Sequence, residues 1–232
     1  MYWRCSDRTG LGVCVDSKRV QQTCAMSSLL PSLSRLSLQS DTVPTAVGPN
    51  DPFHVAIVAT LTNGSEDEKM NALMRLLSDV NGQYSRARAF VDANGMVPMV
   101  ALLLTAPERL KLRTAEVVRE LLGTGVHIRE RFINNGGAQA VVRSLRVPEN
   151  ADPPPGWSLM LRPFLDITEQ LMTLPHGRAR LRSLDAVEVF ASVVRTLGLR
   201  NADGTTININ TRIAMCVIIG LVFDVPSDHG VG

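Results

Sequence analysis

Residues 86–104 read RARAFVDANGMVPMVALLL, and residues 128–146 read IRERFINNGGAQAVVRSLR. The two stretches align without a gap at an offset of 42 residues, which pairs Phe90 with Phe132. A fixed offset of this size indicates an internal repeat, because units of about 20–50 residues that recur are the sequence signature of stacked-repeat architectures. We therefore expect one structural unit to occur several times along the chain.

The repeat extends in both directions from these two stretches. Towards the N-terminus, the same offset pairs the apolar residues of 55–61 with those of 97–103. Towards the C-terminus the offset grows to 49 residues, so that Leu122 pairs with Leu171. Seven residues are inserted, and the proline-rich segment VPENADPPPG (147–156) accommodates them in a surface loop, because this segment cannot be helical.

Each unit is expected to consist of helices. Apolar residues recur every three or four positions, which places them along one face of a helix. Asn94-Gly95 and Gly136-Gly137 are expected to end one helix and open the next, because glycine accepts a positive φ and leaves room at a sharp turn. Phe90 and Phe132 precede these corners by about one helical turn and are predicted to be core residues.

A unit with a short helix, a glycine turn, a second helix and a longer third helix resembles the armadillo repeat. NGMVPMVALLL and GGAQAVVRSLR look like the turn and second helix of that family. The resemblance implies an all-α fold, a right-handed superhelical α-solenoid of about four armadillo-like repeats. The expected organisation is a flexible, disordered leader (1–51), a repeat domain (52–224) with units near 52–93, 94–135, 136–184 and 185–224, and a tail (225–232).

Composition argues against several classes of protein. Lys and Arg outnumber Asp and Glu by only 24 to 22 and aromatic residues make up 4%, so a nucleic-acid partner is not expected. The longest uncharged apolar run, residues 213–223, is shorter than the ~20 residues that a membrane span requires. The four cysteines match neither a metal motif nor a disulfide scaffold, which predicts reduced thiols and a cytoplasmic location.

The leader allows a different location. From Met26 the segment MSSLLPSLSRLSLQS is rich in Ser and Leu and resembles a weak mitochondrial presequence behind an alternative start. A mitochondrial location is therefore the alternative if Met26 begins the protein. The other interpretation of this segment is a disordered tail.

The resemblance also implies where a partner binds. Stacked repeats form a concave face from their third helices, and equivalent residues form ladders along it. The repeat register places eight residues there: Arg75, Asp79, Arg113, Val117, Leu121, Arg162, Asp166 and Gln170. Armadillo proteins that read nuclear-localisation signals carry Trp and Asn ladders on this face. Here only Gln170 offers an amide, so importin-like binding is disfavoured.

Two interpretations of that face remain open. A mixed-sign surface around Val117 and Leu121 fits a protein contact with a small apolar centre and a charged rim. Alternatively, Val117 and Leu121 broaden the buried stripe and the charges are simply solvated.

The last helix has apolar residues around most of its circumference, from Ile213 to Phe223. One hypothesis is that a second copy of the chain, a partner or the leader covers it. The other is that it packs centrally within a compact last repeat.

Catalytic motifs are missing. Gly10 and Gly12 begin a G-x-G, but Val15 stands at the third glycine position, and no other nucleotide, zinc or hydrolase motif is present. His127 and His176 share one repeat position, which favours a helix-start role. We therefore expect no enzyme activity, no cofactor and no bound metal.

The favoured function is a non-catalytic interaction module that holds a partner protein on its concave face. A short solenoid with degenerate ladders also resembles the armadillo-type nucleotide-exchange factors of DnaK-family heat-shock ATPases, which makes a co-chaperone the first alternative. The second alternative is a structural subunit of a eukaryotic flagellar or organellar assembly. These alternatives stay open at this point.

Overall fold

A computed structural model describes residues 51–147, 153, 156–198 and 208–223. All of them belong to one compact unit, Val43–Gly232. The predicted leader, apart from Asp51, and the predicted tail lie outside the described residues, as do most residues of the insertion loop.

The described residues form helices and contain no strand, which confirms the prediction of an all-α fold. Among the described residues, the helices begin at Pro52. The helices are α2 (Pro52–Asn63), α3 (Glu66–Val80), α4 (Tyr84–Asp92), α5 (Met96–Thr105), α6 (Glu108–Gly123), α7 (Val126–Asn134), α8 (Gly137–Leu145), α9 (Trp157–Met172), α10 (Pro175–Arg182), α11 (Ala186–Leu197) and α12 (Ile209–Phe223).

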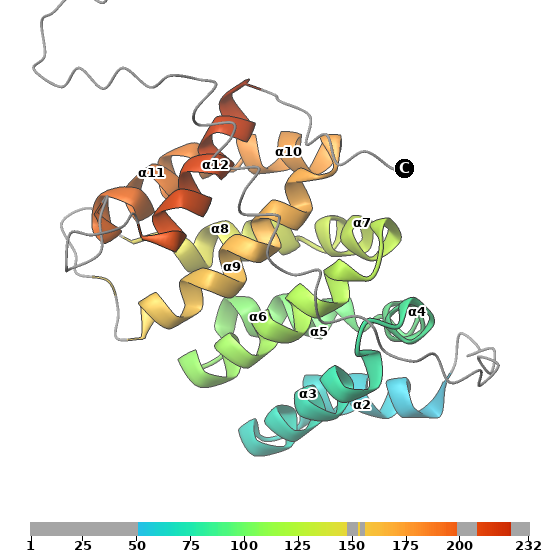
Figure 1. Ribbon diagram of the computed structural model, residues 1–232. Coiled ribbons are helices and arrows are strands. Elements are labelled where there is room, and N and C mark those ends of the chain that lie inside the picture. Colours follow the sequence, from blue (N-terminus) through green and yellow to red (C-terminus); the bar gives the residue numbers. More distant parts are fainter. Residues whose placement is uncertain (1–50, 148–152, 154–155, 199–207, 224–232) are drawn as a thin grey trace, which may run out of the picture. The chain divides into compact units, whose positions relative to one another are not determined.

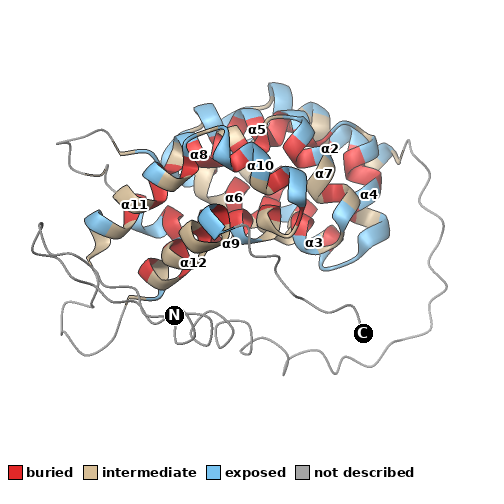
Figure 2. Cartoon of the chain, turned by 90° about the horizontal axis from the view of Figure 1, so that it is seen from above, coloured by how far each residue is buried: buried red, intermediate tan, exposed pale blue. Residues whose placement is uncertain are grey.

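These helices pack in three series (Figure 1). In each unit, the short helix before the corner is the first helix, the helix after the corner is the second, and the longer helix that follows is the third. The first helices are α4, α7 and α10, and they contact one another in chain order. The second helices α2, α5, α8 and α11 do the same, and so do the third helices α3, α6, α9 and α12. Buried residues gather where the series meet, with exposed residues on the outer sides (Figure 2). Each helix therefore shields its apolar face against its counterparts in neighbouring units.

The corners between first and second helices share one backbone conformation. Asn94, Gly136 and Asp185 all have a positive φ, of 62°, 87° and 56°. These residues are separated by the same offsets, 42 and 49 residues, that relate the sequence stretches. The corners at Asn94 and Gly136 were predicted from the glycines. The third was not, because an aspartate at this place does not identify itself as a corner, although Asn and Asp tolerate the left-handed region better than most residues.

Phe90 and Phe132 occupy equivalent surroundings. Both rings are 0% exposed. A Cβ atom added at Gly95 would lie 2.2 Å from the Phe90 ring, and one added at Gly137 would lie 2.4 Å from the Phe132 ring. Each phenylalanine therefore packs against the backbone of the glycine five residues later, which explains why these two residue types recur together.

The last helix, α12, packs on α9 and α11. Ile213, Ala214, Val217 and Leu221 are buried there, whereas Val222 and Phe223 are exposed. This arrangement favours the second hypothesis, in which α12 packs within the last unit. Covering of its remaining apolar surface by a second copy stays a prediction.

No single helix among the described residues is long and apolar enough to cross a membrane, and the one pair that passes the same test, α4 with α5, is bent by 83°. Cys216 is disulfide-bonded. The expectation of reduced thiols was therefore wrong at Cys216, since spacing along the chain does not reveal which cysteines meet in space.

Candidate functional site

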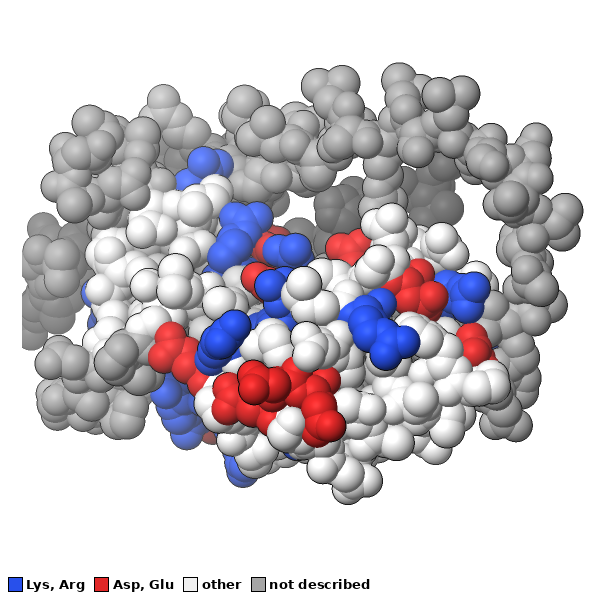
Figure 3. Space-filling model, turned by 90° about the horizontal axis from the view of Figure 1, so that it is seen from below, with Lys and Arg blue, Asp and Glu red and all other residues white. Residues whose placement is uncertain are grey.

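The predicted binding residues fall on three consecutive third helices. Arg75 and Asp79 lie on α3, Arg113 on α6, and Arg162, Asp166 and Gln170 on α9. All six are exposed or partly exposed. Figure 3, which views the molecule from below Figure 1, shows acidic and basic side chains side by side on that end of the molecule. We call the surface formed by these six residues, together with Glu116, Arg119 and Glu169, the third-helix face.

Val117 and Leu121 are not part of that surface. Both side chains are 0% exposed. The helix that carries them, α6, lies between α3 and α9 and contacts both, so its apolar stripe is covered on two sides. The prediction that these two residues form the apolar centre of a docking patch is wrong, and the alternative of a broadened buried stripe is correct.

Polar contacts of Asp166 and Gln170 join α6 to α9. Asp166 lies 2.8 Å from Arg162 Nε and 3.6 Å from Arg119 Nη1. The Gln170 side-chain amide donates to the Arg119 carbonyl oxygen at 3.2 Å. Arg119 belongs to α6, so two of the residues predicted to bind a partner also hold neighbouring third helices in register.

The remaining charges of the face are paired locally or lie close to like charge. Arg113 Nη1 is 2.7 Å from Glu116 Oε2 on the same helix. Desolvation raises the pKa of Glu169, the Asp166 carboxylate raises it further, and Arg162 opposes both effects. Glu169 thus accepts a proton more readily than an ordinary glutamate, and a basic group brought to this part of the face would relieve its repulsion from Asp166.

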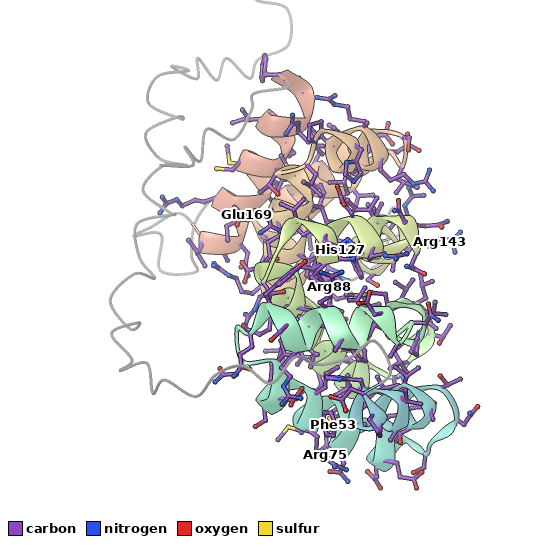
Figure 4. All side chains as sticks on the ribbon, turned by 90° about the vertical axis from the view of Figure 1, so that its right-hand side faces the viewer. Phe53, Arg75, Arg88, His127, Arg143 and Glu169 are labelled. Carbon is purple, nitrogen blue, oxygen red and sulfur yellow. The ribbon has the colours of Figure 1, made fainter. Side chains whose placement is uncertain are left out.

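A shallow hollow of about 500 Å³ opens at the α3 end of the face. Its lining residues are Phe53, Arg75, Ser78, Asp79, Gln83 and Arg86. The Arg75 guanidinium lies 5.5 Å from the centroid of the Phe53 ring, a cation–π distance, and the two side chains are seen together in Figure 4. The hollow thus combines an aromatic wall with donors and one carboxylate.

His54 sits behind this hollow, fully buried between two carboxylates. Its Nε2 is 3.0 Å from Asp79 Oδ2. Its Nδ1 is 3.2 Å from Asp51 Oδ2, an ion-pair distance without the geometry of a hydrogen bond. Arg86 approaches both carboxylates, at 3.3 Å for Asp51 and 3.8 Å for Asp79. The cluster links α2, α3 and α4.

The sequence alone does not reveal the cluster around His54. The placement of Asp51 three residues earlier was visible, but Asp79 and Arg86 reach the histidine only through packing of α3 and α4 on α2. Because His54 is 0% exposed, a substrate cannot touch the imidazole, so the arrangement fits a structural tie better than acid–base catalysis. In the described part of the chain, no group of three or more His, Cys, Asp or Glu could hold a metal ion.

Comparison with known proteins supports the fold alone. An engineered protein of known crystal structure is similar to this chain, with a TM-score of 0.55 and 16% sequence identity over 72% of this chain and 67% of the other. No protein-family model matches the chain, and no curated protein matches its sequence.

Proposed function

We propose that this chain is an armadillo-like solenoid that binds a partner protein on its third-helix face. One observation carries the proposal: α3, α6, α9 and α12 pack in series, and the first three of them bring the exposed charges of three units onto one continuous face. Such a row of equivalent helices is the binding surface of stacked-repeat proteins. The proposed protein is a non-catalytic module.

The chemistry of the face favours a protein partner with charges of both signs. Its residues include Arg113 and Arg162 as exposed or half-exposed cations and Glu169 as a carboxylate with a raised pKa. The hollow beside Phe53 offers the aromatic anchor site that interfaces use for their strongest contacts. Because Val117 and Leu121 are buried, we place the apolar centre of the proposed contact at this hollow and not in the middle of the face.

The experiment places a photo-crosslinking amino acid at Arg113 or Arg162 and, as controls, at Val97 or Val55 on the second helices. All four positions are accessible to solvent. We expect the two face positions to give a common covalent adduct, identified by mass spectrometry, that the controls do not give. Equal labelling from all four positions would contradict the proposal.

Charge reversal then tests the face with the captured partner. Arg113→Glu/Arg162→Glu is expected to weaken binding by about tenfold, about 1.4 kcal/mol, because charges at the rim of an interface steer association. The matched control is Arg143→Glu/Arg195→Glu, which makes the same charge change on α8 and α11. A captured DnaK-type ATPase would identify the exchange-factor alternative, to be checked by release of labelled ADP.

A further inference from the structure

The first helices form an edge that is much more basic than the chain as a whole. Over α4, α7 and α10 this edge carries seven arginines and two acids, whereas the net charge of the whole protein is only +2. We call these three helices the basic edge. Its charged residues are Arg86, Arg88, Asp92, Arg129, Glu130, Arg131, Arg178, Arg180 and Arg182.

Two of these arginines, Arg129 and Arg178, make hydrogen bonds within the fold and occupy equivalent positions 49 residues apart. Arg129 Nε donates to the Leu122 carbonyl oxygen at 2.9 Å, and Arg178 Nη1 donates to the Met172 carbonyl oxygen at 2.8 Å. Each therefore satisfies a carbonyl in the last turn of the preceding third helix, α6 or α9, where a cation is favourable. Burial lowers the pKa of Arg129, as expected for an arginine that serves the interior.

A second equivalent pair points outward instead. Arg131 and Arg180 lie two residues after Arg129 and Arg178, are separated by the same 49 residues, and are exposed. Neither makes an ion pair with any residue that the structure describes. Arg88 on α4 is also exposed, and it is ion-paired with Asp92 on the same helix at 3.5 Å. Arg131 and Arg180 therefore present charge that the described fold does not use.

The order of the helices places Arg131 and Arg180 at equivalent positions of two neighbouring helices, α7 and α10. α4 contacts α7 and α7 contacts α10, and Figure 4 shows α4 and α7 side by side, with Arg88 and His127 labelled on them. Packed helices lie about 8–10 Å apart, which matches about three residues of an extended chain at ~3.3 Å each. Guanidinium groups bind carboxylates through two parallel hydrogen bonds.

We propose that the basic edge binds an extended acidic segment of a partner protein, with two acids about three positions apart held by Arg131 and Arg180. A nucleic acid fits less well, because aromatic residues for base stacking are scarce. The edge contains no residue of the third-helix face, although Arg86 also lines the hollow beside Phe53. The basic edge is thus a second surface, and disproof of acidic-segment binding there would not contradict the proposed function of the third-helix face.

The test uses the full chain and a fluorescent peptide of about ten glutamates, long enough to span three helices at ~3.3 Å per residue. Fluorescence anisotropy is expected to show binding at low salt that weakens as salt screens the charges. Arg131→Glu/Arg180→Glu is expected to lower the affinity by about tenfold, since reversal replaces attraction by repulsion. Circular dichroism confirms that this variant is folded.

The matched control is Arg109→Glu/Arg195→Glu, which makes the same charge change on α6 and α11 and should leave peptide binding unchanged. Arg109 lies at the start of α6, about 20 Å along the helix from the end that Arg129 contacts. Three results would overturn the proposal: equal loss in both variants, no binding by the wild type, or tighter binding of single-stranded oligothymidine or of phosphatidylserine vesicles than of the peptide.

Discussion

Replacing Phe132 by alanine is expected to lower the free energy of unfolding by about 3–5 kcal/mol, the usual cost of removing a fully buried aromatic ring. The ring is 0% exposed and packs against the backbone at Gly137, so the surrounding helices cannot close the cavity without moving a corner. Urea unfolding followed by circular dichroism measures the change, with an unchanged m-value showing that the unfolding transition itself is the same.

The control is Val126→Ala on the same helix, α7, where the side chain is 52% exposed. This substitution should change the free energy of unfolding by less than about 0.5 kcal/mol, as most surface substitutions do. If Phe132→Ala unfolded at the same urea concentration as Val126→Ala, the assignment of Phe132 to the core would be wrong.

Replacing Gly177 by alanine is expected to destabilise the protein by about 1–3 kcal/mol, the usual range for overpacking. An added Cβ would lie 2.2 Å from the Leu171 carbonyl oxygen, which is a backbone atom at the end of α9. Helix propensity alone predicts the opposite sign, because alanine is favoured over glycine within a helix by about 1 kcal/mol. The sign of the change in thermal midpoint therefore decides between packing and propensity.

Gly123→Ala provides the comparison. Gly123 is the last residue of α6, and nothing lies within 4 Å of an added Cβ. At this position the higher helix propensity of alanine acts without a steric clash of the added Cβ. The substitution should therefore be neutral or stabilising by up to about 1 kcal/mol. A Gly177→Ala protein as stable as Gly123→Ala would mean that the end of α9 and the start of α10 do not approach as described.

The sequence predicts those parts of the fold in which local chemistry and the repeat agree. The Phe90 and Phe132 pairs with glycine, the corner at Gly136 and the position of the insertion all follow from residues close to one another along the chain. The corner at Asp185 was missed because aspartate is less diagnostic of a positive φ than glycine is.

The candidate site depends more on tertiary packing and was predicted less well. Arg75, Arg113 and Arg162 lie on α3, α6 and α9 and are exposed or half-exposed, and their role in binding stays a prediction. Val117 was misplaced because burial of α6 on two sides depends on both neighbouring third helices, which helical periodicity cannot show. The His54 cluster was missed for the same reason. Arg131 and Arg180 could have been found, since the 49-residue offset already pairs them.

The equivalence of successive units is the claim on which the proposed function rests, and a pair of double-mutant cycles tests it most directly. Gly137→Ala should destabilise the wild type, because the methyl group meets the Phe132 ring, yet do so much less when Phe132 is already alanine. We predict a coupling of about 1–2 kcal/mol. The Phe90 and Gly95 cycle should give a coupling of the same sign and similar size, whereas coupling in one unit and none in the other would contradict the account.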